Sequence, residues 1–284
     1  YQLRARNPVS TGWDHVDDLC KGGLGRGELG VCIAPTGAGK SMALVHLGAT
    51  AVKNGLSVVH YTLELSDTAV GSRYDSCLTG VSLKDLHGMK EQIYEKVNAV
   101  AGNVIIKEYP TKSATTMTIR THLEKIKQRG IPVDMIIVDY GDLLKPISSS
   151  RNSEKRHDLE SIYEELRGIS QMNECPLWTA SQTNRSGVNA ELVTMENISE
   201  AFNKCFVADF IFSLARTKED KAANKGRIFI AKNRNGPDHH QMELHMNTDN
   251  VKIQVLSPDE YEGAPDAKTQ KEIMAQKYKE LRKA

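Results

Sequence analysis

Residues 34–41 read Ala-Pro-Thr-Gly-Ala-Gly-Lys-Ser, and this run constrains the fold more than any other part of the chain. It lies between a predicted buried strand, residues 28–34, and a predicted helix, residues 41–53. Its glycines let the backbone fold tightly and point N–H groups at phosphate oxygens, and the helix dipole adds to that attraction. The run therefore predicts a phosphate-binding loop made of Pro35, Thr36, Gly37, Ala38, Gly39, Lys40 and Ser41.

In a loop of this kind Lys40 reaches the β- and γ-phosphates of a nucleotide, and the Ser41 hydroxyl binds Mg²⁺. The usual pattern opens with glycine, and Ala34 stands in that place. The departure is mild, because the first position shapes the turn while the Gly-Lys-Ser end makes the main contacts. The alternative is a chance glycine-rich turn, which the surrounding strand, helix and later acidic strand disfavour.

The rest of the chain alternates short apolar runs with segments of helical period, which indicates βαβ units around a mainly parallel sheet. Further strands are predicted at residues 57–63, 103–107, 133–139 and 176–181. Helices are predicted after an N-cap at Asp67, within 81–101 and at 115–129. A further long helix is predicted from apolar residues that share one of its faces: Leu159, Ile162, Tyr163, Leu166, Ile169 and Met172. Short strands at 209–215, 226–232, 240–245 and 251–256 suggest an antiparallel extension. The predicted class is α/β, with one domain over 1–261 and a helical tail over 262–284.

The composition excludes several classes of protein. Lys and Arg number 37 against 36 Asp and Glu, so no global charge drives the chain toward nucleic acid or membrane. The five cysteines include no CxxC pair, which disfavours a zinc or redox motif and fits a reducing cytoplasm. No apolar run has the length of a membrane span, so no membrane association is expected. The start lacks Met and a signal peptide, and we expect an upstream domain.

Acidic and amide side chains follow three of the predicted strands. Asp139 ends a central strand, where its carboxylate can hold Mg²⁺. Glu64 follows the strand at 57–63 and stands between two leucines, so we expect it to be partly buried and to activate the attacking water, with Asp142 as the rival. Gln182 follows the strand at 176–181 and could sense the nucleotide. The alternatives are that Glu64 is a surface residue without a role and that Gln182 is an ordinary amide at a strand end.

Two cations stand two residues apart near the end of the strand at 226–232. Side chains with this spacing on extended backbone point the same way, so Lys232 and Arg234 could clamp a phosphate, with Arg234 as an arginine finger. On the sequence alone, an exposed basic hairpin end explains them equally well.

Together these segments resemble the DnaB-like replicative helicases, which are hexameric RecA-fold motors of bacteria and phages. The resemblance runs from about residue 9 to 256 and is weaker over 81–108 and the tail. The segments that match the family's motifs are 11–14 with 22–29, 34–41, 61–65, 137–140, 181–185 and 232–237. The family's amino-terminal collar domain has no counterpart in the sequence.

The resemblance implies a RecA-like ATPase that uses ATP and Mg²⁺ and moves along single-stranded DNA as a homo-hexamer, unwinding duplex at a replication fork. ATP would lie between subunits, with Glu64 as catalytic base and Lys232 and Arg234 acting on the neighbour's nucleotide. Primase and a helicase loader are possible partners in a bacterial or phage-infected cytoplasm. Candidate DNA-contacting residues lie on two loops, which could also be plain surface loops: Lys145, Arg151, Arg156, Arg185, Ser186 and Gly187.

Two other functions stay open at this point. One is a RecA/RadA- or KaiC-like ATPase of recombination or assembly that does not unwind DNA processively. The other is a non-catalytic nucleotide-binding module, which the coexistence of Lys40, Glu64, Asp139 and Arg234 disfavours.

Overall fold

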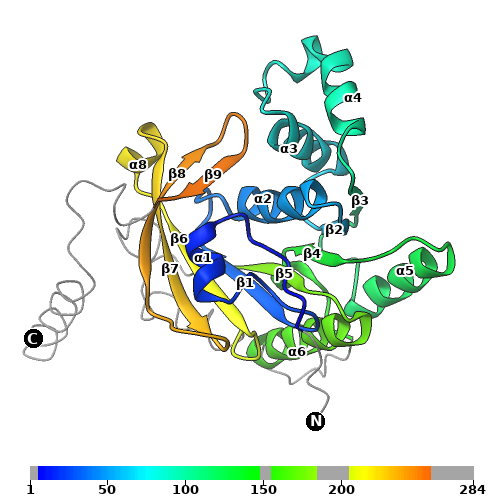
Figure 1. The fold of residues 1–284 in the computed structure, drawn as a ribbon. Helices are drawn as coiled ribbons and strands as arrows, with labels where there is room; N and C mark the ends of the chain where they lie inside the picture. Colours follow the sequence, from blue (N-terminus) through cyan, green and yellow to red (C-terminus); the bar gives the residue numbers. More distant parts are fainter. Residues whose placement is uncertain (1–5, 148–154, 184–204, 257–284) are drawn as a thin grey trace, which may run out of the picture.

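The apolar runs of the sequence become the strands of one nine-stranded sheet with the order β3-β2-β4-β5-β1-β6-β7-β8-β9 (Figure 1). The computed structural model describes residues 6–147, 155–183 and 205–256. The strands are β1 Leu29–Ala34, β2 Ser57–Thr62, β3 Asn103–Glu108, β4 Met135–Asp139, β5 Leu177–Gln182, β6 Phe210–Ala215, β7 Lys225–Asn233, β8 Gln241–Asn247 and β9 Lys252–Val255. The predicted α/β class is confirmed.

The sheet is parallel from β3 to β6 and antiparallel from β6 through β9. The sequence placed residues 209–215 in the antiparallel extension, and that placement was wrong. β6 runs parallel to β1, with Gly30 opposite Phe210, so the extension begins only at β7. A strand that is buried on both faces can pair in either sense, and its burial pattern does not reveal which.

Helices cover both faces of the parallel part (Figure 1). They are α1 Asp14–Leu19, α2 Lys40–Lys53, α3 Asp67–Thr79, α4 Lys90–Asn98, α5 Thr116–Gln128, α6 Lys155–Asn173 and α8 Lys218–Ala222, with short 3₁₀ turns η1 Leu86–Gly88 and η2 Gly141–Leu143. The short helices α1 and α8 were not predicted, because about one and a half turns carry too little periodicity to recognise.

Two details of the helices correct the sequence reading. The cap of α3 is Ser66, whose Oγ accepts the Ala69 N–H at 3.2 Å, and Asp67 is already the first helical residue. Met172 is 53% exposed, in contrast to the other members of the predicted α6 face. It lies in the last turn of the helix, where its sulfur meets the Arg120 guanidinium at 3.4 Å.

The central strand β1 is buried on both faces. Leu29, Val31 and Ile33 pack into the core under α5 and α6, whereas Cys32 and Ala34 belong to the core under α1 and α2. Successive side chains of a strand point to opposite faces, so β1 joins the two cores directly. Both ends of this strand are therefore fixed in position, and the candidate phosphate loop leaves from its carboxyl end.

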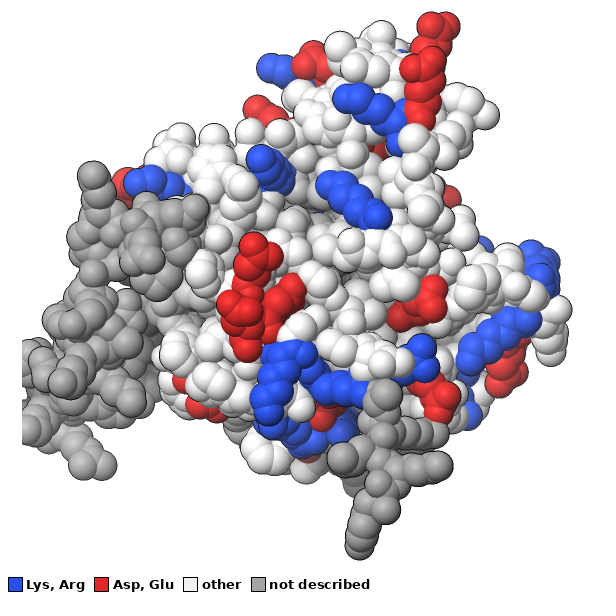
Figure 2. Space-filling view, viewed as in Figure 1, with Lys and Arg blue, Asp and Glu red and all other residues white. Residues whose placement is uncertain are grey.

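The predicted boundary between a domain at 1–261 and a tail at 262–284 falls outside the described residues, so the tail stays a prediction. Among the residues that the structure describes, no helix combines the length and hydropathy needed to cross a lipid bilayer. Figure 2 shows one face of the molecule, with acidic side chains gathered over α1 and basic side chains directly below them. No broad surface of a single charge covers this face.

Candidate nucleotide-binding site

Four predicted site elements meet at one edge of the sheet. The strands β1, β2, β4 and β5 are parallel, so their carboxyl ends lie together, as in other open α/β sheets that bind ligands there. The register places Ala34 beside Gln182, and Thr62 beside Asp139. The phosphate loop, Gln182, Glu64 and Asp139 therefore lie at the same edge.

The phosphate loop needs its two inner glycines. Gly37 and Gly39 have φ angles of 74° and 105°, which side chains rarely adopt. A Cβ on Gly39 would also lie 2.1 Å from the Met246 methyl group, so the antiparallel extension packs directly against the loop. The helix α2 begins at Lys40 without a side-chain cap, which leaves its amino-terminal N–H groups available to phosphate oxygens.

Lys40 is held across the loop. Its side chain is buried, its Nζ donates to the Ala34 carbonyl at 3.2 Å, and it lies 5.7 Å from the centre of the Tyr140 ring. Both contacts are weak compared with an ammonium–phosphate pair, so a bound phosphate can replace them.

Asp139 is the strongest sign of a cation site. It is fully buried, and neither carboxylate oxygen has a hydrogen-bond partner among the described residues. Burial raises the pKa of Asp139 to about 6, and the negative charge of Glu64 raises it further. The nearby Ser41 hydroxyl and the positive charges of Arg73 and Lys40 act in the opposite direction, although Ser41 does not reach hydrogen-bond geometry. A buried carboxylate without a partner is costly, and a divalent cation removes that cost.

The fit to Mg²⁺ is good. Mg²⁺ keeps several waters and binds through one or two protein oxygens plus substrate phosphates, so Ser41 and Asp139 suffice for it. Within residues 6–147, 155–183 and 205–256, no group of three or more His, Cys, Asp or Glu side chains forms a metal cage of its own. The donor set thus suits a metal that arrives with a nucleotide.

The expectation that Glu64 is partly buried was wrong, because its side chain is exposed. The flanking Leu63 packs inward, and its N–H donates to the Asp139 carbonyl at 2.8 Å, while the chain turns Glu64 toward solvent. Its charge still raises the pKa of Asp139 and of Tyr140, so it acts on the same site. An exposed carboxylate beside a metal site can meet water directly.

The rival base, Asp142, is already engaged by the protein. The Tyr163 hydroxyl donates to its Oδ1 at 2.7 Å, and the Gln182 N–H and Ser181 hydroxyl approach its Oδ2 at 3.3 and 3.4 Å. These contacts tie η2 to the end of β5. Asp142 therefore holds Gln182 in place, and the geometry favours Glu64 as the group that meets water.

Gln182 contacts the phosphate loop itself. Its Nε2 donates to the Thr36 hydroxyl, and the Tyr140 hydroxyl donates to its Oε1 at 3.4 Å. This contact joins the phosphate loop directly to the last residue of β5.

Arg73 is a further cation whose charge is felt at this edge of the sheet, and the sequence analysis did not single it out. Burial lowers the pKa of its guanidinium, and the charges of Asp139 and Glu64 oppose that shift. Its position in α3 supplied a usable signal, because Arg73 falls between the buried Val70 and Tyr74, on the face that packs inward.

Lys232 and Arg234 lie at the opposite edge of the sheet. β7 is antiparallel to β6, so its end lies beside the start of β6, with Asn233 opposite Phe210. The five steps from the first to the last residue of β1 separate the two edges by roughly 16 Å, at about 3.3 Å per step. Arg234 therefore cannot reach the phosphates bound by Lys40 of the same chain.

The local contacts of the two cations differ. Arg234 pairs with Asp209 at 3.0 Å and is 43% exposed. The Lys232 Nζ donates to the Phe206 carbonyl and lies 4.4 Å from the centre of its ring. Burial lowers the pKa of Lys232, as do the nearby charges of Arg234 and Arg167, while Asp209 opposes the shift.

The predicted DNA-contacting residues are described only in part. Lys145 is exposed just after η2, and its N–H donates to the Ala114 carbonyl at 2.9 Å. Arg156 lies in α6, of which only the backbone is described at that point. Arg151, Arg185, Ser186 and Gly187 lie outside the described residues, so their roles stay predictions.

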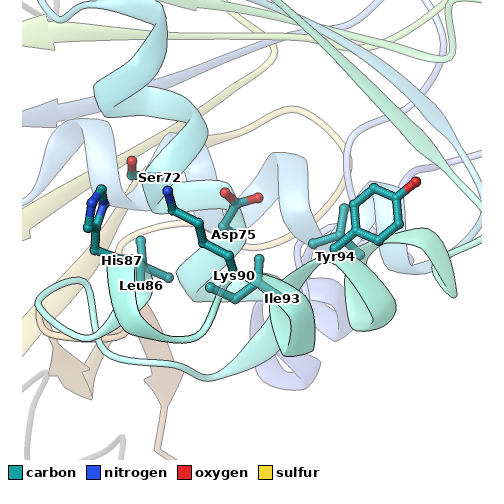
Figure 3. Close-up of a pocket in the computed structure, with 8 residues that line it drawn as sticks. Ser72, Asp75, Leu86, His87, Lys90, Ile93 and Tyr94 are labelled. Carbon is teal, nitrogen blue, oxygen red and sulfur yellow. The ribbon is translucent and has the colours of Figure 1, made fainter.

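A separate cavity of about 360 Å³ opens between α3, η1 and α4, and Figure 3 shows His87 and Tyr94 toward its two ends. It is lined by Ser72, Asp75, Leu86, His87, Lys90, Ile93, Tyr94 and Val97. None of these residues belongs to the phosphate loop or its acidic partners. A loop that binds phosphate through backbone N–H groups needs no deep cavity, so the candidate site does not depend on this one.

Comparison with known proteins agrees with this geometry. A family model described as the DnaB-like helicase C-terminal domain matches residues 8–254. The chain belongs to this family. The matched residues include the phosphate loop, the strands that lead to Glu64 and Asp139, and the segment of Lys232 and Arg234.

Individual relatives support the same assignment. The DnaB-like replicative helicase of Enterobacteria phage T4 is 31% identical over 234 residues, which are 78% of this chain and 49% of that protein. The chain spans about half the length of the curated relatives it matches.

Solved structures support the fold. A DnaB-like replicative helicase solved with its primase interactions aligns with a TM-score of 0.75 at 16% identity, covering 89% of this chain and 63% of that one. A separately solved ATPase domain aligns at 0.74 and 16% identity, covering 88% and 92%. The fold is RecA-like, as the sequence resemblance implied.

The buried carboxylate of Asp139 gives a stability prediction. Folding raises the pKa of Asp139 from 3.8 to about 6, so ionisation of this carboxyl lowers the free energy of unfolding. The loss of stability is absent below about pH 4 and reaches its full size above about pH 6. Two pKa units correspond to at most about 3 kcal/mol. At pH 7.5, without nucleotide, Asp139→Asn should therefore unfold at a higher temperature than the parent protein in calorimetry.

The same variant should lose most of the stabilisation that Mg²⁺ and ATP give the parent, because that stabilisation depends on differential binding to the folded state. Asp134→Asn, at the other end of β4, is the control and should keep it. An Asp139→Asn protein that is less stable than the parent, or that keeps the full effect of Mg²⁺ and ATP, contradicts the metal assignment.

Proposed function

We propose that this chain is the ATP-hydrolysing motor domain of a replicative DNA helicase, acting as a homo-hexameric ring that moves on single-stranded DNA. One observation carries the proposal: Lys40, Glu64, Asp139 and Gln182 share one edge of the sheet, while Arg234 lies at the other. Within a DnaB-like chain, this arrangement fits a nucleotide held between neighbouring subunits.

The proposed roles at the first edge follow from the chemistry. The loop N–H groups and Lys40 hold the phosphates, and Ser41 and Asp139 hold Mg²⁺, which neutralises charge that develops during phosphoryl transfer. Glu64 orients the attacking water and accepts its proton, which its exposed position permits. Gln182 reports the state of the phosphate loop to the residues after β5.

The second edge serves the neighbouring subunit. A contact that pairs two different edges of identical chains is heterologous and closes into a ring when the rotation allows it. Arg234 would then reach the neighbour's γ-phosphate, with Lys232 beside it. The family match disfavours the alternative of a RecA/RadA- or KaiC-like ATPase without processive unwinding.

Partners follow from the relatives and are part of the proposal. A structurally similar replicative helicase was solved with its primase interactions, so we propose a primase, and also a helicase loader, as partners of the whole protein. The site of action would be the cytoplasm of a bacterial or phage-infected cell. Lys145 and the residues around Arg151, Arg156 and Arg185–Gly187 would contact the DNA backbone.

Replacing each of the two candidate bases by its amide tests the chemistry. Glu64→Gln should bind ATP normally and lose hydrolysis by about 10²- to 10⁴-fold, the usual contribution of a general base. Asp142→Asn should retain more activity, since it loosens Gln182 without removing the base. Steady-state hydrolysis and binding of a fluorescent ATP analogue measure the two effects. If Glu64→Gln hydrolyses ATP at the parent rate while Asp142→Asn does not, the base is Asp142.

A forked duplex tests the function directly. The protein should separate the strands in an ATP-dependent manner, and single-stranded DNA should stimulate its ATPase, with binding that weakens steeply as salt rises because the contacts are to phosphate. Lys40→Ala is the control without turnover. A confirmed ring that hydrolyses ATP but neither responds to DNA nor separates a fork supports the recombinase-like or assembly alternative.

A further inference from the structure

Asp209 lies just before β6, at the edge of the sheet that carries Arg234, and it collects more contacts than an ordinary surface acid. Its Oδ2 accepts the Leu29 N–H at 3.0 Å and the Arg167 Nε at 3.1 Å. Its Oδ1 accepts from both Arg167 and Arg234, each at 3.0 Å. The carboxylate itself is only 6% exposed. A buried carboxylate with this many donors is fixed in orientation.

The segment that carries Arg234 is also fixed. The Arg234 N–H donates to the Asp209 carbonyl at 3.0 Å, so backbone and side chain bind the same residue. The neighbouring Asn233 side chain donates to the Leu19 carbonyl at 2.8 Å, and Asn235 donates to Glu28 at 3.1 Å. The turn is thus anchored on both sides of Arg234.

The guanidinium of Arg234 is held at one corner only. Among the described residues it makes one side-chain hydrogen bond, through Nη1, and it is 43% exposed. The Arg167 guanidinium, in contrast, is bound at two nitrogens. Arg234 therefore keeps donors free to reach outward, whereas Arg167 serves to hold the carboxylate.

We propose that Asp209 is the positioning residue of the trans-acting finger, with Arg167 as the clamp that fixes Asp209. The inference rests on the proposed function, in which Arg234 acts on the neighbour's nucleotide. Asp209 holds the Arg234 guanidinium in place at the interface before ATP binds, so the side chain does not have to be ordered during binding.

The opposite role would be sequestration, in which Asp209 withholds Arg234 from the neighbour. The shared carboxylate argues against it, because Arg167 already neutralises Asp209 with two bonds and leaves Arg234 a single one. The two roles predict opposite changes in ATP turnover when the Asp209 charge is lost. Turnover falls if Asp209 positions Arg234 for the neighbour, and it rises if Asp209 keeps Arg234 away from the neighbour.

Asp209→Asn is the direct test, because it keeps the shape and an acceptor for the Leu29 N–H. We expect kcat for ATP hydrolysis to fall by about 10- to 100-fold, as for other misplaced catalytic groups, with the KM for ATP within about twofold of the parent value. ATP binding should persist, since the phosphate loop lies at the other end of β1.

Asp134→Asn is the matched control. Asp134 also precedes a strand and accepts a backbone N–H at the start of its neighbour, from Ser57 at 2.8 Å. It lies at the start of β4, which β5 and β1 separate from β6, and its variant should keep parental kcat. Should Asp209→Asn fail to fold, Arg167→Gln leaves Asp209 in place, removes its clamp and should lower kcat in the same way.

Mixed oligomers separate positioning from general damage. Lys40→Ala lacks a working phosphate loop, and Arg234→Ala lacks a finger, so mixing these two variants should restore hydrolysis at interfaces that combine the intact halves. Asp209→Asn should behave as a finger defect. It should regain activity when mixed with Lys40→Ala and should gain nothing when mixed with Arg234→Ala.

The reference mixture distinguishes the two ways to fail. If Lys40→Ala and Arg234→Ala do not restore each other in confirmed mixed rings, the trans site is wrong and this inference falls with it. If they do, but Asp209→Asn is restored by Arg234→Ala and not by Lys40→Ala, Asp209 supports its own subunit's site instead. A rise in kcat for Asp209→Asn would show sequestration. Each of the last two results overturns the positioning role alone.

Discussion

The burial of β1 between β5 and β6 is the constraint on which the rest of the structure depends. The strand is paired along both edges and packed on both faces, so its two ends are held at a fixed separation. The phosphate loop leaves from one end. At the other, the Leu29 N–H binds the Asp209 carboxylate that holds Arg234. One strand therefore links the site for the chain's own nucleotide with the group proposed to act on its neighbour's.

Groups at the nucleotide edge are arranged at the expense of stability. Asp139 is buried without a hydrogen-bond partner among the described residues, and Lys40 rests on a carbonyl and an aromatic ring. Both arrangements are poor for the isolated fold and good for binding a metal with phosphates. At the edge that carries Arg234 the charges are already satisfied, because Asp209 is paired with Arg234 and Arg167 within the chain itself.

Much of this could be predicted from the sequence because the signals are local. The phosphate loop, the strand that ends at Asp139, and the amide at Gln182 each carry their own pattern of apolar run and punctuation. These features depend on short segments whose conformation is decided by their own residues. The role of Arg234 on a neighbouring subunit came from the family resemblance, and its place at the far edge depends on β6 being parallel to β1 and β7 antiparallel to β6.

What the sequence could not give depends on distant contacts. The exposure of Glu64 follows from how the chain leaves β2, and its leucine neighbours suggested the opposite. Asp209 looks like an ordinary acid until β1, α6 and β7 bring Leu29, Arg167 and Arg234 to it from three separate segments. The parallel direction of β6 was missed for the same reason, since pairing is a property of two strands and not of one.

A structure of the protein with a non-hydrolysable ATP analogue, Mg²⁺ and single-stranded DNA tests the central claim most directly. The account predicts a nucleotide between two subunits, with its γ-phosphate contacted by Lys40 of one subunit and by the Arg234 guanidinium of the next. It also predicts that Asp209 of that second subunit still holds Arg234. A nucleotide bound by Lys40 with no Arg234 from a neighbouring subunit in contact with it, in an assembled ring on DNA, would contradict the account.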